Sequence, residues 1–183
     1  MAQEKVDNED RTPVLARRRE VVLIVIALLV IVLDQLSKHY VVLNLHLGVP
    51  WNPIESLSRY VSFTYITNKG AAFGMFPAFG TFFAVIAIVV VIVILLYYRH
   101  LSNGQWALNV GLGLQLGGAL GNLIDRIRLG HVVDFIDFKV WPIFNVADSS
   151  IVVGVAILAL CILRDEEKAP QQKVSRGSQE ISD

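Results

Sequence analysis

Residues 79–98 read FGTFFAVIAIVVVIVILLYY, twenty positions without a charged side chain. A transmembrane helix needs about 20 predominantly apolar residues, because it must cross roughly 30 Å of hydrocarbon. The composition agrees, since 54% of the 183 residues are apolar and only 17% are charged. Together these features predict an integral membrane protein and argue against a soluble domain.

Three further apolar stretches accompany this one. The first covers about residues 21–43 and contains the charged interruption DQLSK, and the others cover about 105–126 and 143–163. We therefore predict an all-α membrane protein with four transmembrane helices, forming one domain over residues 21–164 between tails at 1–20 and 165–183. An even number of spans places both termini on the same side.

The orientation follows from basic residues near the span ends. Their number is equal on the two sides, but Arg17, Arg18 and Arg19 directly precede the first span, which usually dominates orientation. We predict that both termini are cytoplasmic. No small-residue cleavage site follows this span, so it is predicted to be a retained helix and not a removed signal.

The segment between the first two spans, residues 44–76, differs in composition. Its run Tyr60–Thr67 alternates apolar and polar residues, which predicts a half-buried strand and hence a small extramembrane β element. The lipid headgroup layer is a suitable environment for the aromatic side chains of Trp51, Tyr60 and Tyr65.

In the third span, Gly113, Gly117 and Gly121 repeat every four residues, so we expect a face that packs closely against another helix.

Four carboxylates lie in or beside apolar segments, where charges are costly and usually functional. Asp34 with Lys38, and Asp125 with Arg126, can each be explained as an ion pair or as interfacial groups. Asp148 has no basic neighbour in sequence and is predicted to be functional. Asp134 lies in the connection between the last two spans, which can fold back toward Asp148. Two close carboxyl groups share one proton and so provide an acid and a base, the chemistry of aspartic proteolysis.

Other classes of function fit the sequence less well. The formal net charge is zero and the basic residues are not gathered, which argues against nucleic-acid binding. The single Cys161 excludes an intrachain disulfide, and neither a zinc-protease motif nor a serine-nucleophile motif is present. We expect no metal and no cofactor. A proton-coupled carrier or channel and a purely structural membrane subunit remain as alternatives to an enzyme.

Five motifs in order resemble those of bacterial lipoprotein signal peptidase, the type II signal peptidase. They are DQLSK (34–38), NKGAAFG (68–74), GNLIDR (121–126), VVDFIDF (132–138) and FNVADS (144–149), within a match over residues 21–163. The resemblance implies an aspartic endopeptidase of the bacterial inner membrane with its active site toward the outer face. It would remove signal peptides from diacylglyceryl-modified prolipoproteins just before the lipidated cysteine. It also implies an extramembrane β-cradle, contact with membrane lipid and inhibition by globomycin.

The resemblance also implies roles for individual residues. The catalytic aspartates of the family fall on Asp134 and Asp148. Sequence alone leaves open whether Asp125 or Asp134 partners Asp148, and we select Asp134. The positions that match supporting or substrate-binding residues are Asp34, Lys38, Asn68, Gly70, Ala71, Asn122, Asp125, Arg126 and Asn145.

Overall fold

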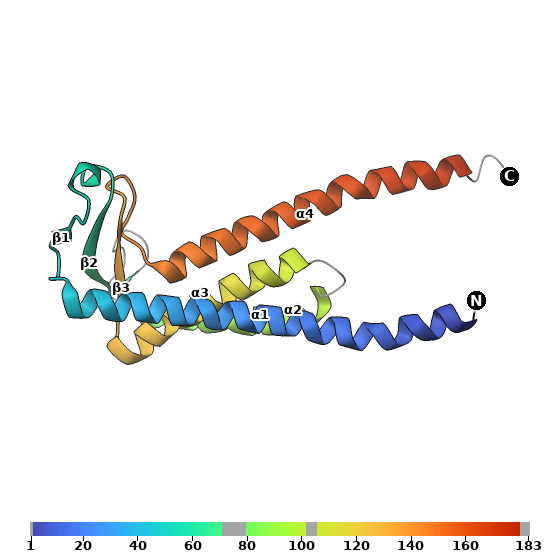
Figure 1. Cartoon of the computed structure of the whole chain (residues 1–183), viewed down its shortest axis with the longest axis horizontal. Coiled ribbons are helices and arrows are strands. Elements are labelled where there is room, and N and C mark those ends of the chain that lie inside the picture. Colours follow the sequence, from blue (N-terminus) through green and yellow to red (C-terminus); the bar gives the residue numbers. More distant parts are fainter. Residues whose placement is uncertain (1, 71–79, 102–105, 180–183) are drawn as a thin grey trace.

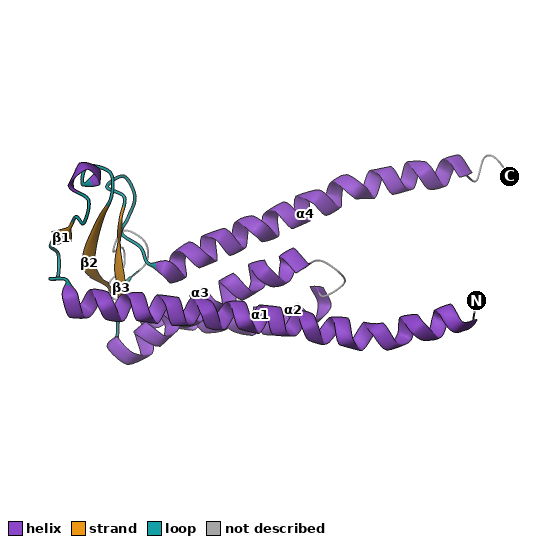
Figure 2. Cartoon of the chain, viewed as in Figure 1, coloured by secondary structure: helices purple, strands orange, loops and turns teal. Residues whose placement is uncertain are grey.

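The computed structural model describes residues 2–70, 80–101 and 106–179. The elements in order are α1 (Ala2–Asn44), β1 (Pro50–Trp51), the short 3-10 helix η1 (Glu55–Leu57), β2 (Ser62–Asn68), α2 (Gly80–Leu101), α3 (Trp106–Leu129), β3 (Val132–Asp137) and α4 (Val146–Gln179). The helices run along one long axis, and the sheet lies across one end of them (Figures 1 and 2). The start of α1 and the end of α4 both lie toward the other end of the long axis.

Three helical segments of the described chain are long and apolar enough to cross a membrane: Glu20–Asn44, Trp106–Leu129 and Val146–Arg164. They coincide with the first, third and fourth predicted spans. The second predicted span coincides with α2, whose apolar part in the described residues is the shorter segment Ala84–Leu96. Four spans therefore stay a prediction. Both α1 and α4 continue beyond the spans, so residues 2–20 and 165–179 of the predicted tails are helical.

The helix α3 lies at the centre of the bundle and packs against α1, α2 and α4. Its glycines allow the predicted close approach, because a Cβ atom on Gly117 would lie 2.7 Å from the carbonyl oxygen of Ala27 in α1. Sequence analysis missed a second contact of this kind, in which Gly154 of α4 lies against the carbonyl oxygen of Gly111. Small residues thus fit α3 between α1 and α4, as in helix packing within membranes.

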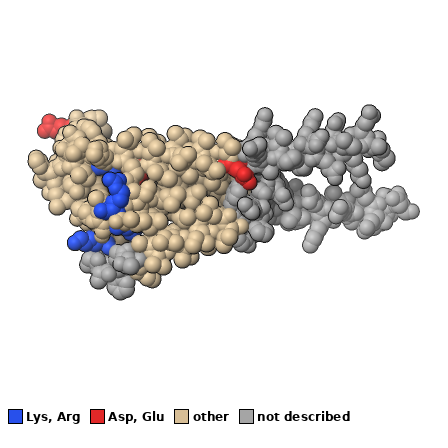
Figure 3. Space-filling model, turned by 90° about the horizontal axis from the view of Figure 1, so that it is seen from below, with Lys and Arg blue, Asp and Glu red and all other residues tan. Residues whose placement is uncertain are grey.

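The outer face of the helices is apolar. In Figure 3 the middle of the visible face carries no charged side chains, which gather toward the sheet end and at the far border of the described part. Large apolar side chains are exposed on this bundle to an extent that a water-soluble domain avoids. Examples are Leu29 at 56%, Leu33 at 59%, Val152 at 67% and Leu160 at 57% exposed.

The sheet is antiparallel with the order β1-β2-β3. The predicted β element between the first two spans is confirmed, with β2 covering most of the alternating run. The prediction that this element is confined to residues 44–76 was wrong. Its third strand, β3, comes from the connection between α3 and α4. Asn68 pairs with Val132, and Ser62 pairs with Asp137. This pairing brings the end of β2 beside Asp134 on β3.

Candidate active site

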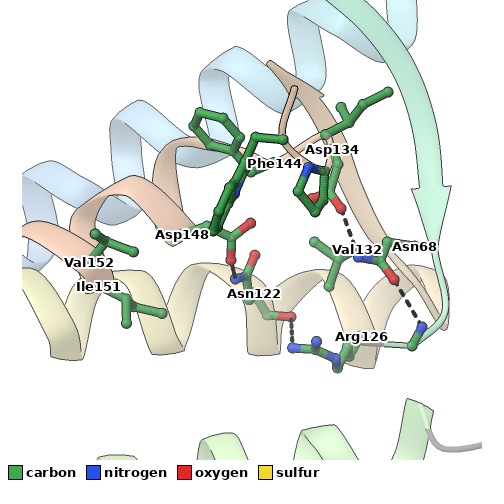
Figure 4. A pocket seen from close by; sticks show the side chains of 13 residues that line it. Asn68, Asn122, Arg126, Val132, Asp134, Phe144, Asp148, Ile151 and Val152 are labelled. Carbon is green, nitrogen blue, oxygen red and sulfur yellow. Dashed lines mark hydrogen bonds between the residues drawn. The ribbon is translucent and has the colours of Figure 1, made fainter. Parts of the chain in front are cut away.

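A pocket of about 260 Å³ lies where the sheet meets the helices (Figure 4). Four elements supply its polar side chains: β2, α3, β3 and α4. Asp134 enters from β3 and Asp148 from α4, both toward the same space. The polar lining residues are Asn68, Asn122, Arg126, Asp134 and Asp148.

Asp134 is a buried carboxyl group with only 1% of its surface exposed. The side-chain amide of Asn68 donates to one of its oxygens at 2.8 Å, and that of Asn145 donates to the other at 2.6 Å. Burial, and then the negative charge of Asp148, raise the pKa of Asp134 to about 7, although these two hydrogen bonds and Lys38 oppose the change. Asp134 can therefore hold or release a proton near neutral pH.

Asp148 lies in the first turn of α4, where local sequence fixes its carboxylate. Asn145 caps this helix, because its side-chain oxygen accepts a hydrogen bond from the Asp148 backbone N–H at 2.9 Å. In return the Asp148 carboxylate accepts one from the Asn145 backbone N–H at 3.3 Å, which is the reciprocal arrangement of a capping box. The amide of Asn122 also donates to Asp148 at 2.8 Å. These contacts fix the position and the orientation of the Asp148 carboxyl group at the start of α4.

Asn145 links the two aspartates through its own side chain. It is completely buried, and its amide nitrogen reaches Asp134 and also the side-chain oxygen of Asn122 at 3.1 Å. The side-chain oxygen of Asn122 therefore accepts a hydrogen bond from Asn145, while its side-chain nitrogen donates one to Asp148. The two asparagines form a fixed bridge between the carboxyl groups.

A buried ion cluster lies next to this bridge. Lys38 forms the predicted ion pair with Asp34 at 2.8 Å, and it also contacts Asp125 at 2.9 Å. The third hydrogen bond of its ammonium group goes to the side-chain oxygen of Asn122 at 3.0 Å. The cluster reaches α4 as well, since Asp34 accepts a hydrogen bond from the Ala147 backbone N–H at 2.9 Å. Lys38 thereby connects α1 with the residues that hold Asp148.

The suggested pairing of Asp125 with Arg126 was wrong. Adjacent helix residues point in different directions, so Asp125 faces Lys38 whereas Arg126 lines the pocket. The Arg126 guanidinium interacts electrostatically with Asp148 and Asp134. It supplies the positive charge of the pocket.

A family model described as Signal peptidase (SPase) II matches residues 26–164. The chain belongs to the signal peptidase II family. A lipoprotein signal peptidase from Halothermothrix orenii is 42% identical over 143 residues, which cover 78% of this chain and 96% of that protein. One from Moorella thermoacetica is 46% identical over 143 residues, covering 76% of this chain and 91% of that protein.

A solved structure agrees with this assignment. It is described as a bacterial membrane enzyme determined by the in meso method at 2.3 Å resolution, and its sequence is 34% identical. The TM-score is 0.71, and the match covers 80% of this chain and 90% of that one. This member of the signal peptidase II family is therefore a protease of bacterial membranes.

The structure brings most of the predicted signal peptidase II site residues together. Asn68, Gly70, Asn122, Arg126, Asp134 and Asp148 line the pocket, and Asn145 bridges the aspartates. Asp34, Lys38 and Asp125 form the adjoining ion cluster. Ala71 lies outside the described residues. Among the residues that are described, no group of three or more His, Cys, Asp or Glu side chains could hold a metal ion.

The sequence analysis missed the apolar wall of the pocket. Trp141, Pro142, Ile143 and Phe144 come directly before Asn145 and line the pocket on one side. Their position offered a signal, since these residues lie in the connection directly before the FNVADS motif, and binding residues are frequent in connecting segments. Phe144 also bonds to β3 through its backbone, including an Ile136 N–H to Phe144 carbonyl bond of 2.8 Å. The wall is thus attached to the strand that carries Asp134.

Proposed function

We propose that this chain is an aspartic endopeptidase that removes the signal peptide from diacylglyceryl-modified prolipoproteins, cutting just before the lipidated cysteine. The observation that carries the proposal is that Asp134 and Asp148 face one pocket from different elements. The relatives named lipoprotein signal peptidase support the choice of substrate.

The two aspartates differ in their surroundings, and this difference assigns their roles. Asp148, as the general base, takes a proton from a water molecule, whose oxygen attacks the scissile carbonyl carbon. Asp134, whose pKa is near 7, donates its proton to the carbonyl oxygen. When the tetrahedral intermediate collapses, the C–N bond breaks and the departing amine takes the proton held by Asp148. Asp134 then recovers its proton from the intermediate's hydroxyl group.

The competing partner, Asp125, is less suited to this chemistry. Its oxygens accept hydrogen bonds from Lys38, from Gln35 at 2.9 Å and from the Val133 backbone N–H at 3.1 Å. These three donors occupy its oxygens, and Asp125 does not line the pocket that Asp134 and Asp148 share. We therefore assign Asp125 a structural role.

An apolar pocket of about 530 Å³ adjoins Asp148. This pocket is an argument for a substrate that carries a lipid. Phe138, Trp141, Phe144 and Val152 form much of its wall. Each buried methylene contributes about 0.8 kcal/mol to binding, so acyl chains placed here would hold the substrate beside the aspartates. Globomycin, which the resemblance implies as an inhibitor, would bind in the same region.

We further propose four spans, with α2 as the second, cytoplasmic termini and an active site at the outer face. The sheet then lies at the outer surface, since it is at the opposite end of the helices from the start of α1. The pocket lies there as well, because residues of β2 and β3 line it. A reporter fused after Leu163 should therefore be cytoplasmic. Periplasmic activity of that reporter would overturn this topology.

Purified protein incubated with a lipidated precursor tests the function. The peptidase yields a shortened product, whereas a carrier, a channel or a structural subunit yields none. The same precursor without its diacylglyceryl group should be processed much more slowly. No cleavage of the lipidated precursor by the wild-type protein would refute the proposal, and equal cleavage of both forms would refute the lipid requirement.

A further inference from the structure

A third cavity, of about 250 Å³, extends from Asp148 between α2, α3 and α4. It shares Asn122, Arg126, Asp148 and Ile151 with the pocket described above, so the two are neighbouring parts of one site. Its remaining lining is apolar apart from one side chain. These residues are Ile86, Ala87 and Val90 of α2, with Gln115 and Ala119 of α3.

Gln115 is the polar side chain of this cavity that the proposed chemistry does not use. It lies within the candidate span Trp106–Leu129 and is partly buried, and its Cγ atom lies beside Gly154 of α4. The described part of the chain offers no hydrogen-bond partner to its amide. An amide without a partner in apolar surroundings costs free energy, and polar groups at such positions usually serve a function.

The position of Gln115 relative to the aspartates suggests what it binds. Gln115 and Asn122 are seven residues apart on the same face of α3, which corresponds to about 10.5 Å along the helix axis. An extended peptide covers that distance in about three residues. The cavity follows the membrane-spanning part of α3 from Arg126 to Gln115, and none of its lining residues belongs to the sheet.

A peptide chain must be extended to be cleaved, and its backbone groups then lack the partners that a helix provides. In an apolar cavity each such group requires a partner from the enzyme. The amide of glutamine both donates and accepts, so it can pair with the C=O and the N–H of a peptide backbone.

We propose that Gln115 binds the backbone of the signal peptide about three residues before the scissile bond. Gln115 is then a substrate-binding residue that recognises the extended backbone of the signal peptide. This recognition does not depend on which apolar side chains the signal peptide carries. This inference rests on the proposed function, because it takes the signal peptide as the segment that occupies the cavity.

The test uses lipidated precursor peptides in which a single backbone amide is replaced by an ester, at each of the second, third and fourth residues before the scissile bond. The ester removes one N–H donor. We expect one of these esters to lower kcat/KM of the wild-type protein by about three- to ten-fold, the effect of one hydrogen bond. In Gln115→Met, which keeps the length of the side chain but has no amide, amide and ester substrates should be cleaved at equal rates.

Val90→Ala is the matched control, because it alters the apolar wall of the same cavity and leaves the amide in place. It should slow both substrates equally and preserve the wild-type ratio. The melting temperature of Gln115→Met should match that of the wild type, since the side-chain amide forms no hydrogen bond with the residues that the structure describes. A clear fall would show that the amide bonds inside the protein, and would overturn the proposal.

The other outcomes are also decisive. If no ester slows the wild-type protein, or if Gln115→Met keeps the wild-type ratio, Gln115 does not bind the backbone, although cleavage of the amide substrate still supports the proposed function. If the wild-type protein cleaves none of the peptides, the proposed function itself fails.

Discussion

Replacing Lys38 with Met should damage both the stability and the activity of this protein. Lys38 is 3% exposed, and its ammonium group contacts Asp34, Asp125 and Asn122 at 2.8, 2.9 and 3.0 Å. The substitution keeps an unbranched apolar side chain but leaves two buried carboxylates without their shared cation. Breaking a buried ion pair in this way costs about 3–5 kcal/mol, which corresponds to a fall in Tm on the order of 10 °C.

The loss of activity has a separate cause. Lys38 holds the side-chain oxygen of Asn122, so that the nitrogen of the same amide points at Asp148. A hydrogen bond to a charged group contributes about 1.5–3 kcal/mol. If that energy fixes the orientation of Asn122, kcat of the folded variant should fall by about ten- to a hundred-fold.

Two further variants separate these effects in melting and cleavage assays. Lys38→Met combined with Asp125→Asn removes one of the unbalanced carboxylates, so it should recover much of the lost stability but little of the activity. Lys139→Met removes the cation from the more exposed ion pair with Asp137 and should change either quantity little. Wild-type stability and wild-type kcat in Lys38→Met would refute the role assigned to the ion cluster.

Two other predictions follow from the packing of α3 and the protonation of Asp134. Gly117→Leu should lower Tm strongly in detergent, because its Cβ atom would overlap the backbone of α1. The control Ala156→Leu, on the exposed face of α4, should not lower Tm. Equal melting curves of the two variants would show that this glycine face is not packed. Activity should fall as the pH rises through about 7, where Asp134 loses its proton, and a flat pH profile from 6 to 9 would contradict the assignment. The raised pKa of Asp134 means that the folded protein favours the protonated form of this carboxyl group. The contribution of Asp134 to the free energy of unfolding should therefore decline as the pH rises from about 4 to about 7. Melting curves of Asp134→Asn should lack that part of the pH dependence.

Three of the four predicted spans and the glycine face of α3 were predictable because their signals are local. A run of about 20 apolar residues indicates a helix long enough to span a membrane, and the four-residue spacing of Gly113 and Gly117 specifies one helix face. The alternation from Tyr60 to Thr67 likewise indicated a strand. Each of these signals depends on residues that are close together in the sequence.

Contacts between distant segments were harder to predict. Strand β3 was missed because Val132–Asp137 becomes a strand only by pairing with β2, more than sixty residues earlier. The predicted ion-pair partner of Asp125 was wrong for a similar reason, because Lys38 approaches Asp125 only when α1 packs on α3. The lack of a hydrogen-bond partner for the Gln115 amide among the described residues had no signal in the sequence, since glutamine in a spanning helix usually bonds to a neighbouring helix.

Cleavage of a lipidated precursor by Asp134→Asn, Asp148→Asn and Asp125→Asn tests the central claim most directly. Asparagine keeps the size of aspartate but cannot exchange the proton. The first two variants should therefore lose nearly all activity while their melting curves stay cooperative, and the double variant should be scarcely worse, as expected of groups that act on one water molecule. Asp125→Asn should retain measurable cleavage. An active Asp134→Asn together with an inactive Asp125→Asn would show that the wrong partner was assigned, and an active Asp148→Asn would contradict the aspartic mechanism itself.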